Sequence, residues 1–250
     1  MTVSLAVTTT NNSTIKHSTN MKKVLFTLIA MVVSATSFAQ LIADKTDKKV
    51  TLGFDIFHDF QLKTSDNWDA RGFNQGASWA ITYNFPLGES SKHTVSIGAG
   101  MSYHNYFSYS RILNPYADTL QYLQCRDLEN FKRFKVNANY VDVPLELRFR
   151  IKDQVKIGVG FKLGILVMAK TKYVGPDDEA GTLTGGNGQL VHEKLTYINN
   201  VERYNYSATL RVGWKWVSVF AAYQLNPVFE VGHNAPVIHP LTVGLSFAPF

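Results

Sequence analysis

The residues with the clearest chemical potential are a serine, a histidine and a carboxylate, the types that form a nucleophile with its activating base. They stand at Ser102, His104 and Asp59. Residues two apart on a strand share a face, so Ser102 and His104 would lie side by side, whereas no spacing brings Asp59 to them. Separate polar residues at the rim of a sheet explain the pattern more simply, and we predict no enzymatic activity.

A metal site and a reactive thiol are the other chemistries that residue types suggest. The segment GPDDEAGTLTGGNGQ carries Asp177, Asp178 and Glu179, but it lacks the spaced oxygen ligands of a calcium loop and is typical of a solvated connection. Cys125 is the only cysteine, so it can form neither an intramolecular disulfide nor a zinc site with several thiolates. No basic residue at a fixed spacing would activate its thiol. We predict neither metal nor cofactor.

Ten charged residues recur at alternate positions of strand-like segments, which would place them together on one face. Four are acidic and six are basic: Asp55, Asp59, Asp142, Glu146, Arg148, Arg150, Lys156, Lys162, Arg211 and Lys215. They could line a charged conduit, or they could pair with one another and fill the space between them. A buried charge persists only when it is paired and hydrogen-bonded, so we favour pairing.

The elements that carry these residues are strands, because apolar and polar residues alternate with a period of two. The alternating segments are 50–62, 78–85, 93–103, 141–151, 155–167, 204–214, 217–225 and 241–247. After residue 40, no apolar run is long enough for a helix that spans a bilayer, and no helical period is sustained. The sequence therefore predicts eight strands.

The connections between these strands alternate between long and short. The long ones cover 63–75, 110–134, 174–200 and 226–239, and the short ones are PLGESSK, KDQ and a tight turn near Trp216. This order is typical of outer-membrane barrels. We predict an all-β fold, an eight-stranded antiparallel transmembrane β-barrel with long extracellular loops and short periplasmic turns. Segment 50–62 should pair antiparallel with segment 241–247, because a membrane barrel leaves no unpaired edge.

The sizes of the side chains on the two faces favour a membrane barrel over a soluble one. The polar face consists mainly of Gly, Ser, Thr and Ala, which suits the interior of an eight-stranded barrel, since that interior holds packed side chains and no aqueous channel. The apolar face is rich in aromatic residues, as expected where strands cross a membrane interface. The predicted interface aromatics are Trp79, Tyr83, Phe85, Tyr204, Tyr206, Trp214, Trp216 and Tyr223.

The N-terminus has the pattern of a secretory signal peptide. After Met21, a lysine pair precedes an apolar stretch, and Ser37 and Ala39 supply the small side chains of a cleavage site. We predict an N-terminal extension and signal peptide at 1–39, ending in the signal peptide 21–39, a periplasmic lead-in at 40–49 and an outer-membrane barrel at 50–250. Without the leader, 22 of the 25 basic residues face 19 acidic ones, an excess too mild for nucleic-acid binding.

Three stretches resemble the outer-membrane β-barrel family of the Bacteroidetes, whose members are described as porin-family or PorT-like. They are the signal peptide, the segment NYVDVPLELRFRIKDQVKIGVGFKLGILV and the ending NPVFEVGHNAPVIHPLTVGLSFAPF. The C-terminal Phe250 resembles the signal read by the barrel-assembly machinery, although Pro249 departs from the usual pattern. The resemblance implies an outer-membrane location, with membrane lipid, the assembly machinery and secretion-system or surface ligands as partners.

The resemblance implies little chemistry, because most members of the family have no assigned activity. Three functions therefore stay open. The protein could be a structural or surface-interaction barrel that acts through its extracellular loops, an accessory of a secretion system, or an outer-membrane enzyme. The narrow, filled interior favours the first function, because it leaves the loops as the part of the chain that can meet a partner.

Overall fold

The computed structural model describes residues 49–62, 64–88, 93–126, 129–151, 155–176 and 190–248. None of these residues belongs to a helix long and apolar enough to cross a membrane. The signal peptide, the lead-in up to residue 48, the acidic residues 177–179 and the C-terminal Phe250 lie outside this part of the chain. The strands are β1 (Val50–Leu62), β2 (Gln75–Leu87), β3 (His93–Ser108), β4 (Ser110–Ile112), β5 (Tyr122–Gln124), β6 (Arg133–Ile151), β7 (Val155–Pro176), β8 (Leu190–Thr196), β9 (Tyr204–Trp214), β10 (Val217–Gln224) and β11 (His239–Phe247).

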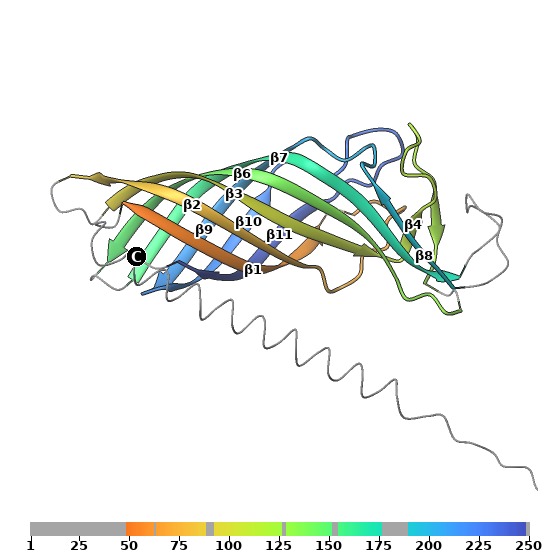
Figure 1. Cartoon of the computed structure of the whole chain (residues 1–250), viewed down its shortest axis with the longest axis horizontal. Helices are drawn as coiled ribbons and strands as arrows, with labels where there is room; N and C mark the ends of the chain where they lie inside the picture. The colour runs from red at the N-terminus through yellow and green to blue at the C-terminus, as the bar shows by residue number, and fades with distance from the viewer. Residues whose placement is uncertain are drawn as a thin grey trace, which may run out of the picture. The chain divides into compact units, whose positions relative to one another are not determined.

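Eight of these strands form a closed antiparallel barrel, as the sequence predicted. Their order around the barrel is β1, β2, β3, β6, β7, β9, β10 and β11, and β11 pairs with β1 to complete the circle. The closing register runs from Phe54 opposite Phe247 to Leu62 opposite His239. Figure 1 shows the strands wound obliquely around the barrel. Closure leaves no edge strand with unpaired backbone groups in the hydrocarbon.

The connections alternate in length as predicted. Short turns join β2 to β3, β6 to β7 and β9 to β10 at one end of the barrel. The other end carries the long connections, which include the β4–β5 hairpin and the short strand β8, paired to the end of β7 (Figure 1). The two ends therefore differ in construction, with compact turns on one side and folded loops on the other.

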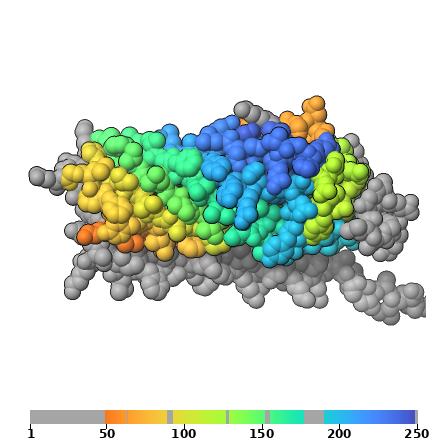
Figure 2. All heavy atoms as spheres, turned by 90° about the horizontal axis from the view of Figure 1, so that it is seen from above, coloured from red at the N-terminus to blue at the C-terminus, as the bar shows by residue number. Residues whose placement is uncertain are grey.

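In the half of the barrel that holds the short turns, outward-facing apolar side chains alternate along each strand with inward-facing polar ones. In β6, Val143, Leu145 and Leu147 point outward, while Asp142 and Glu146 point inward. Large apolar side chains of adjacent strands are exposed on the outer wall, among them Ile81, Leu145 and Leu210, and Figure 2 shows the strands following one another around that wall. An apolar outer wall around a polar interior is the arrangement of a membrane barrel.

Strands β6 and β7 extend beyond the limits that the sequence predicted. β6 begins at Arg133 rather than at 141, and β7 ends at Pro176 rather than at 167. In these extensions the alternation continues with its polarity reversed, because Phe134, Val136 and Ala138 are buried inside the barrel. A β-bulge between β6 and β7 at Asn139/Tyr140 accompanies the reversal. The predicted boundaries were therefore wrong, since they assumed one polarity for each face.

Candidate functional site

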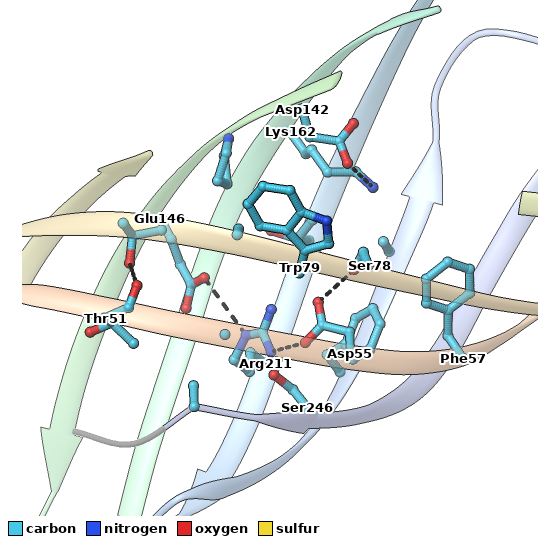
Figure 3. Close-up of a pocket in the computed structure, with 18 of the residues that line it drawn as sticks. Thr51, Asp55, Phe57, Ser78, Trp79, Asp142, Glu146, Lys162, Arg211 and Ser246 are labelled. Atoms are coloured by element: carbon cyan, nitrogen blue, oxygen red, sulfur yellow. Dashed lines mark hydrogen bonds and ion pairs between the residues drawn. The ribbon is translucent and has the colours of Figure 1, made fainter. Parts of the chain in front are cut away.

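The lumen near the short turns contains a connected set of charged side chains. Arg211 from β9 lies between two carboxylates, with its Nη1 3.2 Å from Asp55 Oδ1 and its Nε 3.7 Å from Glu146 Oε2. Ser78 Oγ donates a hydrogen bond of 3.0 Å to the second oxygen of Asp55. Figure 3 shows these groups converging from β1, β2, β6 and β9. One arginine thus ties together strands from opposite sides of the barrel.

Arg148 belongs to the same network through Glu146, and Lys162 forms a second ion pair in this part of the lumen. Arg148 Nε lies 3.2 Å from Glu146 Oε1, and Arg148 Nη1 donates a hydrogen bond of 2.9 Å to Asn84 Oδ1. Lys162 Nζ lies 3.5 Å from Asp142 Oδ2 (Figure 3). Each of these cations has a carboxylate within ion-pair distance, which offsets part of the cost of removing the charges from water.

Glycine in the barrel wall provides the room for these long side chains. A Cβ atom added to Gly158 would lie 2.0 Å from Glu146 Oε1, and one added to Gly164 would lie 2.8 Å from Asp142 Oδ1. The network borders an internal space of about 80 Å³, a volume suited to a few water molecules. Small residues on the polar face therefore leave the space that the large charged side chains occupy in the lumen.

Seven of the ten charged residues predicted for the lumen lie in its interior, each with a side-chain partner within ion-pair distance: Asp55, Asp59, Asp142, Glu146, Arg148, Lys162 and Arg211. Arg150 and Lys156 lie opposite each other near the short β6–β7 turn, and Lys156 Nζ donates to the backbone oxygen of Lys215. The assignment of Lys215 to the lumen was wrong. It occupies the tight β9–β10 turn at φ 54°, exposed to solvent, with its ammonium 4.4 Å from the centre of the Trp214 ring.

Deeper in the lumen, the structure joins two residues that the sequence could not bring together. His104 Nδ1 lies 2.8 Å from Asp59 Oδ2, and Thr242 Oγ1 donates a hydrogen bond of 2.6 Å to Asp59 Oδ1. Phe57 packs beside the histidine, with a distance of 4.9 Å between ring centres. These residues are inside the barrel rather than at its rim, because β3 continues to Ser108.

This histidine and carboxylate do not have the setting of a hydrolytic site. Asp59, Ser102 and His104 are all buried, and the Ser102 Oγ makes no hydrogen bond to any described residue. A nucleophile must be within hydrogen-bond reach of its base and must be accessible to a substrate. The arrangement instead connects β1, β3 and β11 across the lumen.

At the end opposite the short turns, the long connections fold into an apolar core that covers the lumen. We call this core the loop cap. Its buried residues come from the connections and from the ends of β3, β6 and β7: Trp68, Tyr106, Ile112, Leu120, Cys125, Phe134, Val136, Ala138, Tyr140, Ala169, Tyr173, Ile198, Val201, Val228, Phe229 and Ile238. Apolar groups exclude water efficiently, and these buried side chains pack at this end of the barrel.

Hydrogen bonds from one connection to another, and from a connection to the end of β1, hold the loop cap together. Trp68 Nε1 donates to Gln61 Oε1 at 2.6 Å, and Asn234 Nδ2 donates to the backbone oxygen of Leu120 at 2.8 Å. The Tyr122 hydroxyl donates to the backbone oxygen of Asn234 at 3.1 Å. Burial raises the pKa of the Tyr122 phenol above its ordinary value, so the hydroxyl keeps the proton that it donates. The described segments that carry these residues thus belong to one folded unit.

A buried arginine in the loop cap was not foreseen from the sequence. Arg111 is only 2% exposed, its Nη2 lies 2.8 Å from Glu193 Oε2, and its guanidinium carbon lies 3.8 Å from the centre of the Tyr173 ring. These contacts join the β4–β5 hairpin to β7 and β8. Arg111 stands in a strand of three residues, which is too short for a period-two pattern to reveal its buried side.

The thiol and metal predictions can be compared with the structure in part. Cys125 is buried in the loop cap, where its Sγ donates to the backbone oxygen of Leu123 at 3.4 Å. No cluster of three or more histidine, cysteine, aspartate or glutamate residues suited to a metal ion occurs among the described residues. The candidate calcium ligands Asp177, Asp178 and Glu179 stand outside them.

Comparison with known sequences assigns the fold to a family. The family described as "Outer membrane protein beta-barrel domain" matches residues 38–232. The chain belongs to this family. Among solved structures, this outer-membrane barrel is similar to Ail, the attachment invasion locus protein of Yersinia pestis, with 13% identity over 80% of this chain and 95% of that chain and a TM-score of 0.33. No curated protein matches the chain.

The predicted interface aromatics of this outer-membrane barrel all stand on its outer wall or at its turns. Tyr83, Phe85, Trp214 and Trp216 lie toward the short turns. Trp79, Tyr204, Tyr206 and Tyr223 lie toward the long connections. Aromatic side chains at both borders of an apolar band are the usual anchors of barrels in the outer membrane.

Proposed function

We propose that this protein is a closed, non-conducting barrel that acts as a structural or surface-interaction protein of the outer membrane. The loop cap is the observation that carries the proposal. It closes the external end with packed apolar side chains, while ion pairs occupy the lumen below it. The interior of an eight-stranded barrel is too narrow for a water-filled path beside these groups. The external face of the loops is then the part that meets other molecules.

Apolar side chains on the outside of the loop cap support a contact role. Phe73, Tyr197 and Val231 are 69%, 69% and 75% exposed, although each belongs to a connection that is otherwise tied into the cap. Tyr197 is held at φ 58°, and its backbone N–H donates to Ala169 at 2.8 Å. Exposed aromatic groups on a fixed backbone lose little conformational entropy on binding, which suits a recognition surface.

Planar-bilayer recordings on the purified protein test the closed barrel. We expect no steady channels of porin-like conductance, because the loop cap and the ion pairs leave no continuous water path. Stable openings in a preparation of correctly folded protein would contradict the proposal. Mild proteolysis of the external loops before recording serves as a comparison, since it tests whether the cap is what closes the barrel.

Outer-membrane lipid, the barrel-assembly machinery and surface ligands are the partners that this function requires. An accessory role in secretion, which the PorT-like resemblance implies, is the alternative to a surface role. Deletion of the gene separates the two, because loss of exported proteins from the medium would favour secretion. Unchanged export with altered surface contacts would favour the proposed function. Residues 21–39 and Phe250 belong to the same proposal, as the export signal and the assembly signal.

A further inference from the structure

Three lysines stand directly opposite one another on the outer wall of the barrel, near its capped end. Lys135 of β6 pairs in register with Lys172 of β7, and Lys172 pairs in register with Lys194 of β8. We call these three residues the lysine row. Their chain neighbours Phe134 and Tyr173 are buried inside, so the lysines themselves point outward. Adjacent strands are about 4.8 Å apart, so the Cα atoms of the three lysines lie within a span of about 10 Å.

Two more basic residues border the lysine row. Arg133 follows the same outer face of β6, and Lys170 stands two residues before Lys172 on β7. Like charges directly opposite each other destabilise a sheet. Of the ion pairs in the described part of the chain, none involves these five cations. This contrasts with the lumen, where Arg148, Arg211 and Lys162 each have a carboxylate.

Glu193, the carboxylate nearest to the lysine row in strand register, forms its ion pair with Arg111 and not with a lysine of the row. Glu193 stands beside Lys194 on β8 but faces the interior, where it pairs with Arg111 at 2.8 Å. On the outer face, Lys135 Nζ donates to Asn105 Oδ1 at 2.7 Å and lies 5.3 Å from the centre of the Phe107 ring. Neither neighbour carries negative charge. The structure thus holds several like charges together and supplies no anion from the described residues of that face.

The lysine row lies just beyond the apolar outer wall. On β7, outward apolar residues continue as far as Val167 and Met168, and Lys172 stands four residues past Met168. Four residues of a strand tilted by about 40° rise by about 10 Å along the barrel axis. A lysine side chain can extend back toward the membrane over part of this distance. This is the level of lipid headgroups, which form a layer outside the hydrocarbon core.

We propose that the lysine row, together with Arg133 and Lys170, binds the phosphate groups of lipids in the outer leaflet of the outer membrane. Phosphate takes several charge-assisted hydrogen bonds at once, so ammonium groups on adjacent strands can share one headgroup. The outward direction, the level above the apolar wall and the adjacent Phe107 ring favour a lipid over a free phosphate ion. The bound phosphates supply the counter-charge that the described residues of this face do not provide.

Binding of lipid A to the detergent-solubilised full chain, followed by native mass spectrometry, tests the proposal. The variant is Lys172→Gln with Lys194→Gln. The matched control is Lys49→Gln with Lys215→Gln, which removes the same charge from exposed positions at the short-turn end. Each basic residue near an anionic headgroup is worth roughly a fivefold change in binding, so the row variant should bind at least about tenfold more weakly. The control should bind as the unmodified protein does.

Two further arms identify the ligand chemistry. Lipid A with its phosphates removed should bind about as weakly to the unmodified protein as intact lipid A binds to the row variant. Inorganic phosphate should not displace lipid A at equal concentration. The proposal is overturned if the row variant and the control bind equally, if the dephosphorylated lipid binds as well as lipid A, or if inorganic phosphate competes equally. Heat-dependent migration in gels verifies that both variants are folded before the comparison is made.

Discussion

Replacement of Glu146 by alanine would break the lumen network at its most connected carboxylate. Glu146 is buried and lies within ion-pair distance of both Arg148 and Arg211. Removing one partner of a buried ion pair typically costs about 3–5 kcal/mol, because the remaining charge stays buried without compensation. Here Arg211 keeps Asp55, and Arg148 keeps its hydrogen bond to Asn84. We therefore expect the free energy of unfolding to fall by less, about 2–3 kcal/mol.

Urea unfolding of the barrel in lipid vesicles, followed by tryptophan fluorescence, measures this loss. With a urea dependence of about 2 kcal/mol per molar, the midpoint should move down by about 1 M. Glu146→Gln keeps the shape and one acceptor, so its midpoint should lie between those of Glu146→Ala and the unmodified protein. Glu230→Ala is the control, since Glu230 is exposed in a loop and its loss should cost less than about 0.5 kcal/mol. Equal midpoints for Glu146→Ala and this control would refute a stabilising network.

Three other substitutions probe different parts of the molecule. Gly158→Ala should lower the free energy of unfolding in the same assay by about 1–3 kcal/mol, because the added methyl group occupies the place of the Glu146 carboxylate; an unchanged urea midpoint would show that the carboxylate has room to move. Trp68→Ala should loosen the loop cap at a cost of about 3–5 kcal/mol and speed cleavage of the loops by protease on intact cells, and cleavage at the unmodified rate would contradict a packed cap. Asp59→Asn should lower the free energy of unfolding by about 1–3 kcal/mol, because it weakens the contact with His104. The temperature at which the heated protein changes its migration in a gel should fall, and an unchanged temperature would contradict this prediction.

The barrel itself could be derived from the sequence because its signals are local. Each membrane strand alternates in polarity within its own ten or so residues, and each short turn follows directly from a break in that alternation. Closure of β1 on β11 needed one more argument, namely that hydrocarbon tolerates no unpaired edge. The filled lumen followed from the small residues on the polar face, of which Gly158 beside Glu146 is the clearest case.

Contacts between distant segments could not be derived in this way. The Asp59 and His104 pair depends on the register of β1 against β2 and of β2 against β3, which a single sequence does not specify. The loop cap depends on apolar residues such as Trp68 and Phe229 that stand in segments without any period. Their types alone do not tell whether they pack together or contact a partner. The burial of Arg111 in the same cap could not be predicted for the same reason.

The reversal of polarity along β6 explains both the boundaries that were predicted wrongly and the position of the lysine row. Within the membrane, lipid requires an apolar outer face, so Val141 and Val143 face out and Asp142 faces in. Above the membrane, the outer face meets water and headgroups, so it can carry Lys135, while the inner face packs against the loop cap and becomes apolar. A strand that crosses this border keeps its period of two but exchanges its faces. The exchange between residues 139 and 141 therefore marks the outer border of the membrane on β6, and the same border on β7 lies between Met168 and Lys170.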